Sequence, residues 1–308
     1  MNRKIFAILI TLLFLLSVLS VSITACCLQI KTTETVAVTE ITQAPETTVV
    51  ETVAETTSQV IETIAETPET FPETTQQSYF ENIEDKIRFK VEDKMFPSDW
   101  YNKEINAKAK DLSLSEIERS KNIIINALKK YPEDVLITLN KTYVLGYLSF
   151  YGVEYGGTNS SDCVYITNKG VKAGFTDLYI KNSFHHEFSH ILLRSYSSFL
   201  NTELWENINP KNFKYLGTGV EAIKEGKASE VYDSSLNEKG FLYKYAQSNL
   251  EEDFGSFAEN IFVNDPLFWK AIDKYPKLKE KFNLVVDFYH SINPIFTEEY
   301  FREISQNK

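Results

Sequence analysis

The first clear periodic segment follows Ser113. Its apolar residues recur at helical spacing as far as Pro132: Ile117, Ile123, Ile124, Ala127, Leu128 and Tyr131. This spacing predicts a helix that ends before the proline. Ser113 and Glu116 also have the spacing of a capping box, in which two side chains satisfy backbone N–H groups at a helix start.

Two segments with the composition of β-strands come next. Residues from Thr142 to Tyr155 are rich in aromatic and branched side chains and stop at two glycines, and a shorter run covers Cys163–Thr167. Both are predicted to be strands. The shorter run either pairs with an extended substrate beside an active site or is simply another strand of the sheet.

Helical patterns dominate the remainder. Asn182 or Ser183 is expected to cap a helix over Phe184–Tyr196, and Asn249 is expected to cap another. Residues 201–240 have a loop-rich composition, and the residues after the Asn249 helix have a helical pattern to the end. The order predicts an α+β domain, with a small mixed sheet in the first half and a helical C-terminal half.

The amino terminus has the organisation of an export signal. Within residues 1–25 a basic start precedes an apolar stretch, which ends at Ile23-Thr24-Ala25-Cys26. That order resembles a lipoprotein processing site, at which Cys26 would be acylated. An uncleaved membrane anchor is the alternative. Either interpretation places the rest of the chain outside the cytoplasm, attached to a membrane.

Residues 26–78 are expected to form a disordered stalk. From residue 31 they are rich in Thr and carry nine glutamates but one lysine. Such a segment cannot bury enough apolar surface to offset its ordering entropy. The folded domain is therefore predicted to span residues 79–308.

Charge and cysteine content exclude other classes. The net charge is −11 and there is no basic cluster, so nucleic-acid binding is not expected. Of the three cysteines, Cys26 and Cys27 lie at the processing site, which leaves Cys163 as a single buried thiol rather than part of a disulfide framework.

The chemistry centres on His186-Glu187-Phe188-Ser189-His190. Residues four apart share one face of a helix, so His186 and His190 can converge on one zinc ion. Glu187 can then act as the general base on a water molecule without being a ligand. The neighbouring His185 points away from that face and is expected to be structural or exposed, as is the distant His290.

A catalytic zinc ion needs a third protein ligand and an open position. Glu251 and Glu252 follow Asn249 at the start of a predicted helix. These acids can equally serve the helix dipole, with Glu252 closing a capping box to Asn249. The residues alone leave the choice open.

Three groups of residues together resemble a bacterial family of zinc-binding metallopeptidases. They are the histidine motif, the stretch with Trp205, Asn209-Pro210, Phe213 and Tyr215, and the pattern Tyr245, Asn249, Glu252-Asp253-Phe254. The family is of the gluzincin type and is similar to the catalytic domain of anthrax lethal factor. The resemblance covers about residues 136–262 and implies a zincin-like fold.

The resemblance also implies roles for individual residues. Glu252 would be the third zinc ligand, with Glu251 as the second choice, and Tyr245 would stabilise the oxyanion. The family often continues Asp-Phe-Ala-Glu where this chain has Gly255 and Ser256, which puts a role for a second acid in doubt.

The expected function is therefore that of an exported, membrane-tethered peptidase with one Zn²⁺ and a peptide or protein substrate. The alternatives are a non-catalytic zinc-binding domain and an adhesion module of a surface lipoprotein. The presence of Glu187 favours the enzyme, because a purely structural zinc site has no use for that acid.

Overall fold

The computed structural model describes residues 83–263 and 265–306. The expected signal segment, the Cys26 acylation site and the stalk lie outside these residues. Within the described part, none of the helices combines the length and apolarity that a membrane span requires.

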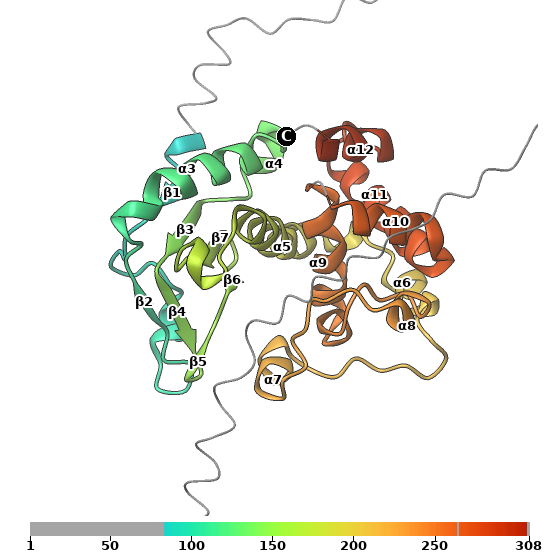
Figure 1. The fold of residues 1–308 in the computed structure, drawn as a ribbon, viewed down its shortest axis with the longest axis horizontal. Coiled ribbons are helices and arrows are strands. Elements are labelled where there is room, and N and C mark those ends of the chain that lie inside the picture. Colours follow the sequence, from blue (N-terminus) through green and yellow to red (C-terminus); the bar gives the residue numbers. More distant parts are fainter. Residues whose placement is uncertain (1–82, 264, 307–308) are drawn as a thin grey trace, which may run out of the picture. The chain divides into compact units, whose positions relative to one another are not determined.

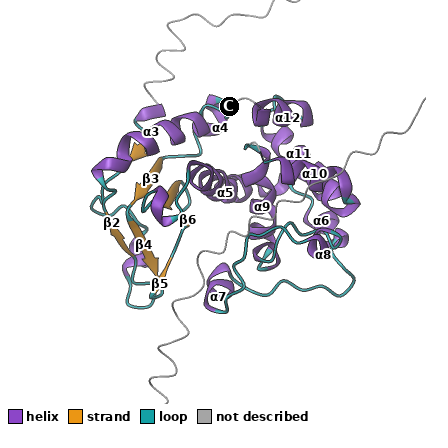
Figure 2. Cartoon of the chain, viewed as in Figure 1, coloured by secondary structure: helices purple, strands orange, loops and turns teal. Residues whose placement is uncertain are grey.

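The first half of the described chain forms two small sheets (Figures 1 and 2). One has the order β1-β3-β7-β6 and the other the order β2-β4-β5. In the first sheet β3 is parallel to β1 and β7, whereas β6 is antiparallel to β7. The strands are β1 Ile87–Arg88, β2 Lys108–Lys110, β3 Lys141–Leu145, β4 Tyr147–Phe150, β5 Val153–Glu154, β6 Gly157–Asn159 and β7 Cys163–Thr167.

Ten α-helices accompany the strands in the described residues, most of them in the second half. They are α3 Leu114–Leu128, α4 Glu133–Leu136, α5 Asp177–Ser195, α6 Thr202–Ile208, α7 Gly219–Lys224, α8 Ser234–Asn237, α9 Leu250–Ile261, α10 Pro266–Lys274, α11 Pro276–Ile292 and α12 Glu298–Gln306. In Figure 1, α5 runs between the strands and the C-terminal helices. The expected α+β class, with a small mixed sheet and a helical C-terminal half, is confirmed.

Alternation along the central strands divides the core in two. Val144, Val164 and Ile166 face the large cluster formed with α3, α5 and the C-terminal helices. Tyr143 and Tyr165 point the other way, into a smaller cluster with Met95 and Phe96. Because side chains alternate across a strand, β3 and β7 are buried on both faces and hold α5 against one of them.

The single strand expected over Thr142–Tyr155 is wrong, because the segment folds as β3, β4 and β5. A β-carbon at Gly146 would lie 2.5 Å from the carbonyl oxygen of Asp111, so the chain crosses between the sheets there. Tyr151 and Gly152 then form a turn with positive φ angles of 55° and 73°.

One expected helix start and one expected capping box also differ. The helix with the histidines begins at Asp177 rather than Phe184, because the Thr176 hydroxyl accepts a hydrogen bond from the Tyr179 N–H and caps it. The capping box at the start of α3 does not form. The Glu116 carboxylate instead accepts a hydrogen bond from Arg119, whose Nε lies 2.8 Å from Oε2.

Candidate metal centre

Helices α5 and α9 pack against each other through the residues expected to bind metal. All five residues of the motif are buried in the middle of α5. Gly255 of α9 lies opposite: a β-carbon there would come within 2.8 Å of His186 Cε1 and His190 Nε2. The glycine therefore leaves room for the two rings between the helices.

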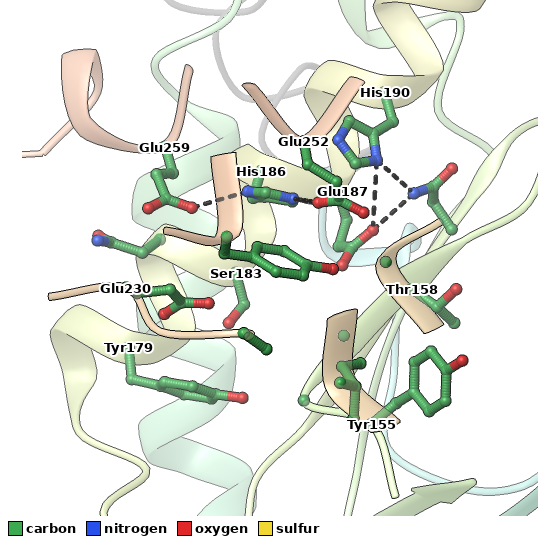
Figure 3. Close-up of a pocket in the computed structure, with 18 of the residues that line it drawn as sticks. Tyr155, Thr158, Tyr179, Ser183, His186, Glu187, His190, Glu230, Glu252 and Glu259 are labelled. Atoms are coloured by element: carbon green, nitrogen blue, oxygen red, sulfur yellow. Dashed lines mark hydrogen bonds and ion pairs between the residues drawn. The ribbon is translucent and has the colours of Figure 1, made fainter. Parts of the chain in front are cut away.

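The structure brings His186, His190 and Glu252 together (Figure 3). Each offers one ligand atom, and these atoms lie within 4.8 Å of one another. Glu252 Oε2 is 2.9 Å from His186 Nε2. The two histidines come from successive turns of one helix and the glutamate comes from another, so the three side chains form a tripod.

Glu252 rather than Glu251 faces the histidines. The Asn249 side chain caps α9 by accepting a hydrogen bond from the Glu252 N–H at 2.9 Å, as expected. The Glu252 carboxylate, however, turns to His186 and does not close a capping box. The Glu251 carboxylate lies 3.7 Å from Arg194 Nη1, outside the tripod.

His186 lies between two carboxylates. Its Nδ1 is 2.8 Å from Glu259 Oε2, on the opposite side of the ring from Glu252. Burial by itself would lower the pKa of His186, but the hydrogen bonds to Glu252 and Glu259 raise it well above its usual value. Glu259 is in turn held by the Tyr243 hydroxyl. Without a metal, a proton on His186 is therefore the cation that balances these acids.

The other ring has different partners. His190 Nε2 is 3.0 Å from the Glu251 carbonyl oxygen, which can only accept, so this nitrogen carries the ring proton. Asn159 Nδ2 approaches Nδ1 at 3.2 Å. Burial, followed by the nearby His186 charge, lowers the pKa of His190 to about 3. The ring is thus neutral, which is the form that binds a metal ion.

Glu187 is fixed by the edge strand of the sheet. Asn159 of β6 donates a hydrogen bond of 2.6 Å to its Oε2, and Arg194 donates to the same asparagine. A β-carbon at Gly157 would lie 2.8 Å from Glu187 Oε1, so the strand passes directly beside the carboxylate. Burial raises the pKa of Glu187 to about 7, against the lowering effects of His186 and Asn159.

Tyr245 also reaches this site, from the short 3-10 helix η4 (Tyr245–Gln247). Its ring centroid is 6.4 Å from that of His186. A β-carbon at Gly219 would meet both the Tyr245 hydroxyl, at 2.6 Å, and Glu252 Oε1, at 2.7 Å. Burial and the Glu252 charge raise the pKa of Tyr245, so the hydroxyl keeps its proton and can donate it.

A cleft of about 710 Å³ opens over these residues. One wall is β6, which is the edge strand of its sheet within the described chain, and another is α7. Of the two alternatives for Cys163–Thr167, pairing with a substrate is wrong and the other, simply another strand of the sheet, is confirmed. That segment is β7, and both of its edges are occupied by β3 and β6. The edge that faces the cleft belongs to β6.

The other histidines and the cysteine noted in the sequence lie outside the metal centre. His185 is fully buried, with Nδ1 2.8 Å from the Tyr131 hydroxyl and its ring stacked on Phe262. His290 is exposed on α11. Cys163 is a buried free thiol, as expected.

The remaining motif residues form a second buried cluster behind α9. Asp253 Oδ2 accepts hydrogen bonds from Trp205 Nε1 at 3.1 Å and from the Tyr215 hydroxyl at 2.8 Å. It also pairs with Lys281 of α11 at 2.5 Å, and both charged side chains are fully buried. These contacts hold α9 against α6 and α11, so this part of the motif positions Glu252 without touching it.

Sequence reasoning missed Glu259 and Asn159. Glu259 lies seven residues after Glu252, which is two helical turns and the same face of α9, so the spacing contained a signal for it. Glu259 supplies a second acid beside the histidines, although this chain has Ser256 at the position where the family often has one. Asn159 lies in a three-residue strand 28 residues before Glu187, and no local pattern marks it.

The donor set fits a zinc ion. Two imidazoles and one carboxylate are the ligands of catalytic zinc sites, which leave a fourth position open. His186 Nε2 faces Glu252, and the other ring nitrogen, Nδ1, contacts the Glu259 carboxylate. Such a second partner is common for metal-bound histidines.

One comparison with known protein families agrees with this chemistry. The model of a family described as "Putative zinc-binding metallo-peptidase" matches residues 147–295, which include the whole tripod, Glu187 and Tyr245. A crystal structure described as a putative zinc-binding metallo-peptidase from Bacteroides caccae is 17% identical. It covers 76% of this chain and 92% of its own, with a TM-score of 0.47. None of the curated proteins matches the chain. The resemblance to the metallopeptidase family, expected from the motifs, is confirmed.

Proposed function

We propose that this chain is a zinc-dependent peptidase that acts outside the cytoplasm while attached to a membrane. The observation that carries the proposal is the tripod of His186, His190 and Glu252, with the Glu187 carboxylate beside it in an open cleft. In this proposal the tripod holds one zinc ion. The ion would polarise the scissile carbonyl and lower the pKa of a water molecule.

The chain's own residues supply the remaining steps. Glu187 accepts a proton from the attacking water and passes it to the leaving amine as the C–N bond breaks. A pKa of about 7 suits both directions of transfer near neutral pH. Asn159 keeps the carboxylate oriented through its 2.6 Å hydrogen bond. The Tyr245 hydroxyl donates a hydrogen bond to the carbonyl oxygen as negative charge develops on it.

The substrate is proposed to lie along β6. Among the described strands β6 pairs only with β7, so an extended peptide can add to its other edge through main-chain hydrogen bonds. Such binding places a peptide carbonyl beside Glu187, because Gly157 of the same strand is in contact with that side chain.

The Glu187→Gln variant tests the enzyme. The full chain in detergent is loaded with zinc and incubated with a mixed peptide library, and cleavage is followed by mass spectrometry. We expect the variant to retain stoichiometric zinc and to lose cleavage by a factor of at least ~100. Glu206→Gln, on the exposed face of α6, is the control and should cleave normally. Bound zinc without cleavage by the unmodified chain would indicate a non-catalytic zinc-binding domain, and no bound zinc would favour an adhesion module.

Attachment to the membrane is tested separately. In a bacterial host the unmodified chain should incorporate radiolabelled palmitate, and Cys26→Ser should not. A chain that remains in the membrane after this substitution, without label, would indicate an uncleaved anchor instead.

A further inference from the structure

We propose that Glu230 makes the cleft selective for peptides that carry a positively charged group close to the scissile bond. The inference rests on the proposed peptidase function and adds the class of substrate to it. Glu230 lies in the loop after α7, and its carboxylate points into the cleft between Glu259 and Tyr179 (Figure 3).

The backbone places Glu230 firmly in relation to the site. The preceding residue, Ser229, accepts a hydrogen bond of 3.1 Å from the Tyr245 N–H through its carbonyl oxygen. At the other end of the segment, the N–H of Leu216 and that of Gly217 donate to Gln247 and Ser248 at 3.0 and 2.9 Å. Residues 216–230, here called the α7 loop, are therefore tied at both ends to the segment that carries Tyr245.

Glu230 differs from the other acids of the cleft in having no partner. Glu154 pairs with Lys169, and Glu251 pairs with Arg194. Glu252 and Glu259 contact His186, and Glu187 accepts a hydrogen bond from Asn159. Glu230 forms no hydrogen bond or ion pair with any residue of the described chain. A zinc ion would offset Glu252 and Glu187. Glu230 is exposed to the solvent of the cleft, so only water balances its charge until a ligand binds.

The surroundings of this carboxylate suit a long cationic side chain. Val220, Ile223 and Ala228 of the α7 loop line the same cleft and provide an apolar wall. Lysine and arginine bury their aliphatic stems on such surfaces while the charged group meets an acid or water. Partial desolvation in the cleft and the nearby Glu259 raise the pKa of Glu230 to about 7, so a bound cation would favour the ionised form near neutral pH.

A peptide can present this positive charge as a side chain or as a free α-amino group. The test therefore uses three octapeptides that differ only at one central residue and in whether the amino terminus is acetylated. The first is acetylated and carries lysine at one of the four central positions. The second carries norleucine there, and the third is the norleucine peptide with a free amino terminus. Binding is measured by calorimetry on zinc-loaded Glu187→Gln protein, and cleavage is measured on the unmodified protein.

We expect a charged peptide to bind about tenfold more tightly than the acetylated norleucine peptide. Glu230→Gln, introduced into the same background, should reduce this ratio to about one and leave zinc content unchanged. Glu225→Gln is the matched control, because Glu225 lies on the same loop but pairs with Lys227 and does not line the cleft. A preference for lysine identifies a side-chain pocket, and a preference for the free terminus identifies a subsite for the α-amino group.

Equal binding of all three peptides, or a preference that survives in Glu230→Gln, overturns the proposal, as does the absence of peptide binding. These results are independent of hydrolysis, because they come from the Glu187→Gln background. If peptides bind with the expected preference but the unmodified protein cleaves none, the selectivity stands and the peptidase function fails.

Discussion

Two neighbouring acids on α9, Glu252 and Asp253, belong to clusters of different kinds. Asp253 is fully buried, and the donors around it include a lysine of opposite charge. That cluster is therefore neutral and closed to solvent. Glu252 lies among Glu187, Glu259 and one protonated histidine at the wall of a cleft, so its cluster has more negative than positive charge. A closed, neutral cluster stabilises the fold, whereas an open, charged one is suited to binding a cation.

The closed cluster should dominate stability. Asp253→Ala leaves Lys281 charged and unpaired in the core, which is expected to cost about 3–5 kcal/mol of unfolding free energy. Urea denaturation of the metal-free protein measures this loss. Asp273→Ala, which removes an exposed pair with Arg302, should cost less than about 1 kcal/mol. Similar losses for the two variants would mean that the buried pair is not a structural lock.

The open cluster should dominate metal binding. Glu252→Gln removes one leg of the tripod, so zinc affinity should fall by more than the ~100-fold that the loss of an outer partner can cause. Competition with a fluorescent chelator gives the dissociation constant. The unfolding free energy of the metal-free protein should change by less than about 1 kcal/mol, because the acid is at the cleft wall. A large loss of stability with normal zinc binding would reverse the comparison.

Glu259 should have an intermediate effect. Glu259→Gln keeps a hydrogen-bonding group near His186 Nδ1 but removes its charge, so zinc affinity should fall by about 10–100-fold. The same chelator competition applies. Ser256→Ala is a suitable control, because the Ser256 hydroxyl bonds to the Asp253 carbonyl of its own helix. An effect of Ser256→Ala as large as that of Glu259→Gln would argue for general disturbance of α9.

The smallest effect concerns acid stability. Burial lowers the pKa of His185 well below its usual value, so the folded protein keeps this ring neutral. The unfolded chain binds a proton there below about pH 6.5 and the folded chain does not, so stability is lost as the pH falls. The expected contribution is up to about 1.4 kcal/mol per pH unit.

This contribution is measured by urea unfolding of metal-free protein between about pH 7 and about pH 5. His185→Phe should show a shallower loss of stability than the unmodified chain, because the variant has no proton to bind there. Parallel curves for the two proteins would contradict the assignment.

Sequence reasoning succeeded where the chemistry follows local spacing. The histidines are one helical turn apart, and Asn249 caps α9 as expected. The fold class followed from the order of the segments. Whether Glu252 and Tyr245 have their expected roles stays a prediction, although both lie at the tripod.

The failures have a common physical origin in distant partners. Ser113 and Glu116 have the spacing of a capping box, but Arg119 takes the glutamate and links it to Asp177, 58 residues from the arginine. The break at Gly146 depends on the carbonyl group of Asp111, which follows β2 and is distant in sequence. Asn159 and Glu230 acquire their surroundings only when the helices and the sheet assemble, so no local pattern identifies them, whereas Glu259 has a helical spacing from Glu252 that marks it.

Asn159 has a consequence for turnover. The Asn159 amide group, carried by the strand that a peptide would extend, also holds the Glu187 carboxylate that is proposed to move the proton. A long substrate would stiffen this strand and with it the catalytic side chain, whereas a dipeptide would leave both loose. Binding energy from contacts remote from the scissile bond would therefore increase the rate of cleavage as well as the affinity. Shortening the substrate should lower kcat and also raise KM.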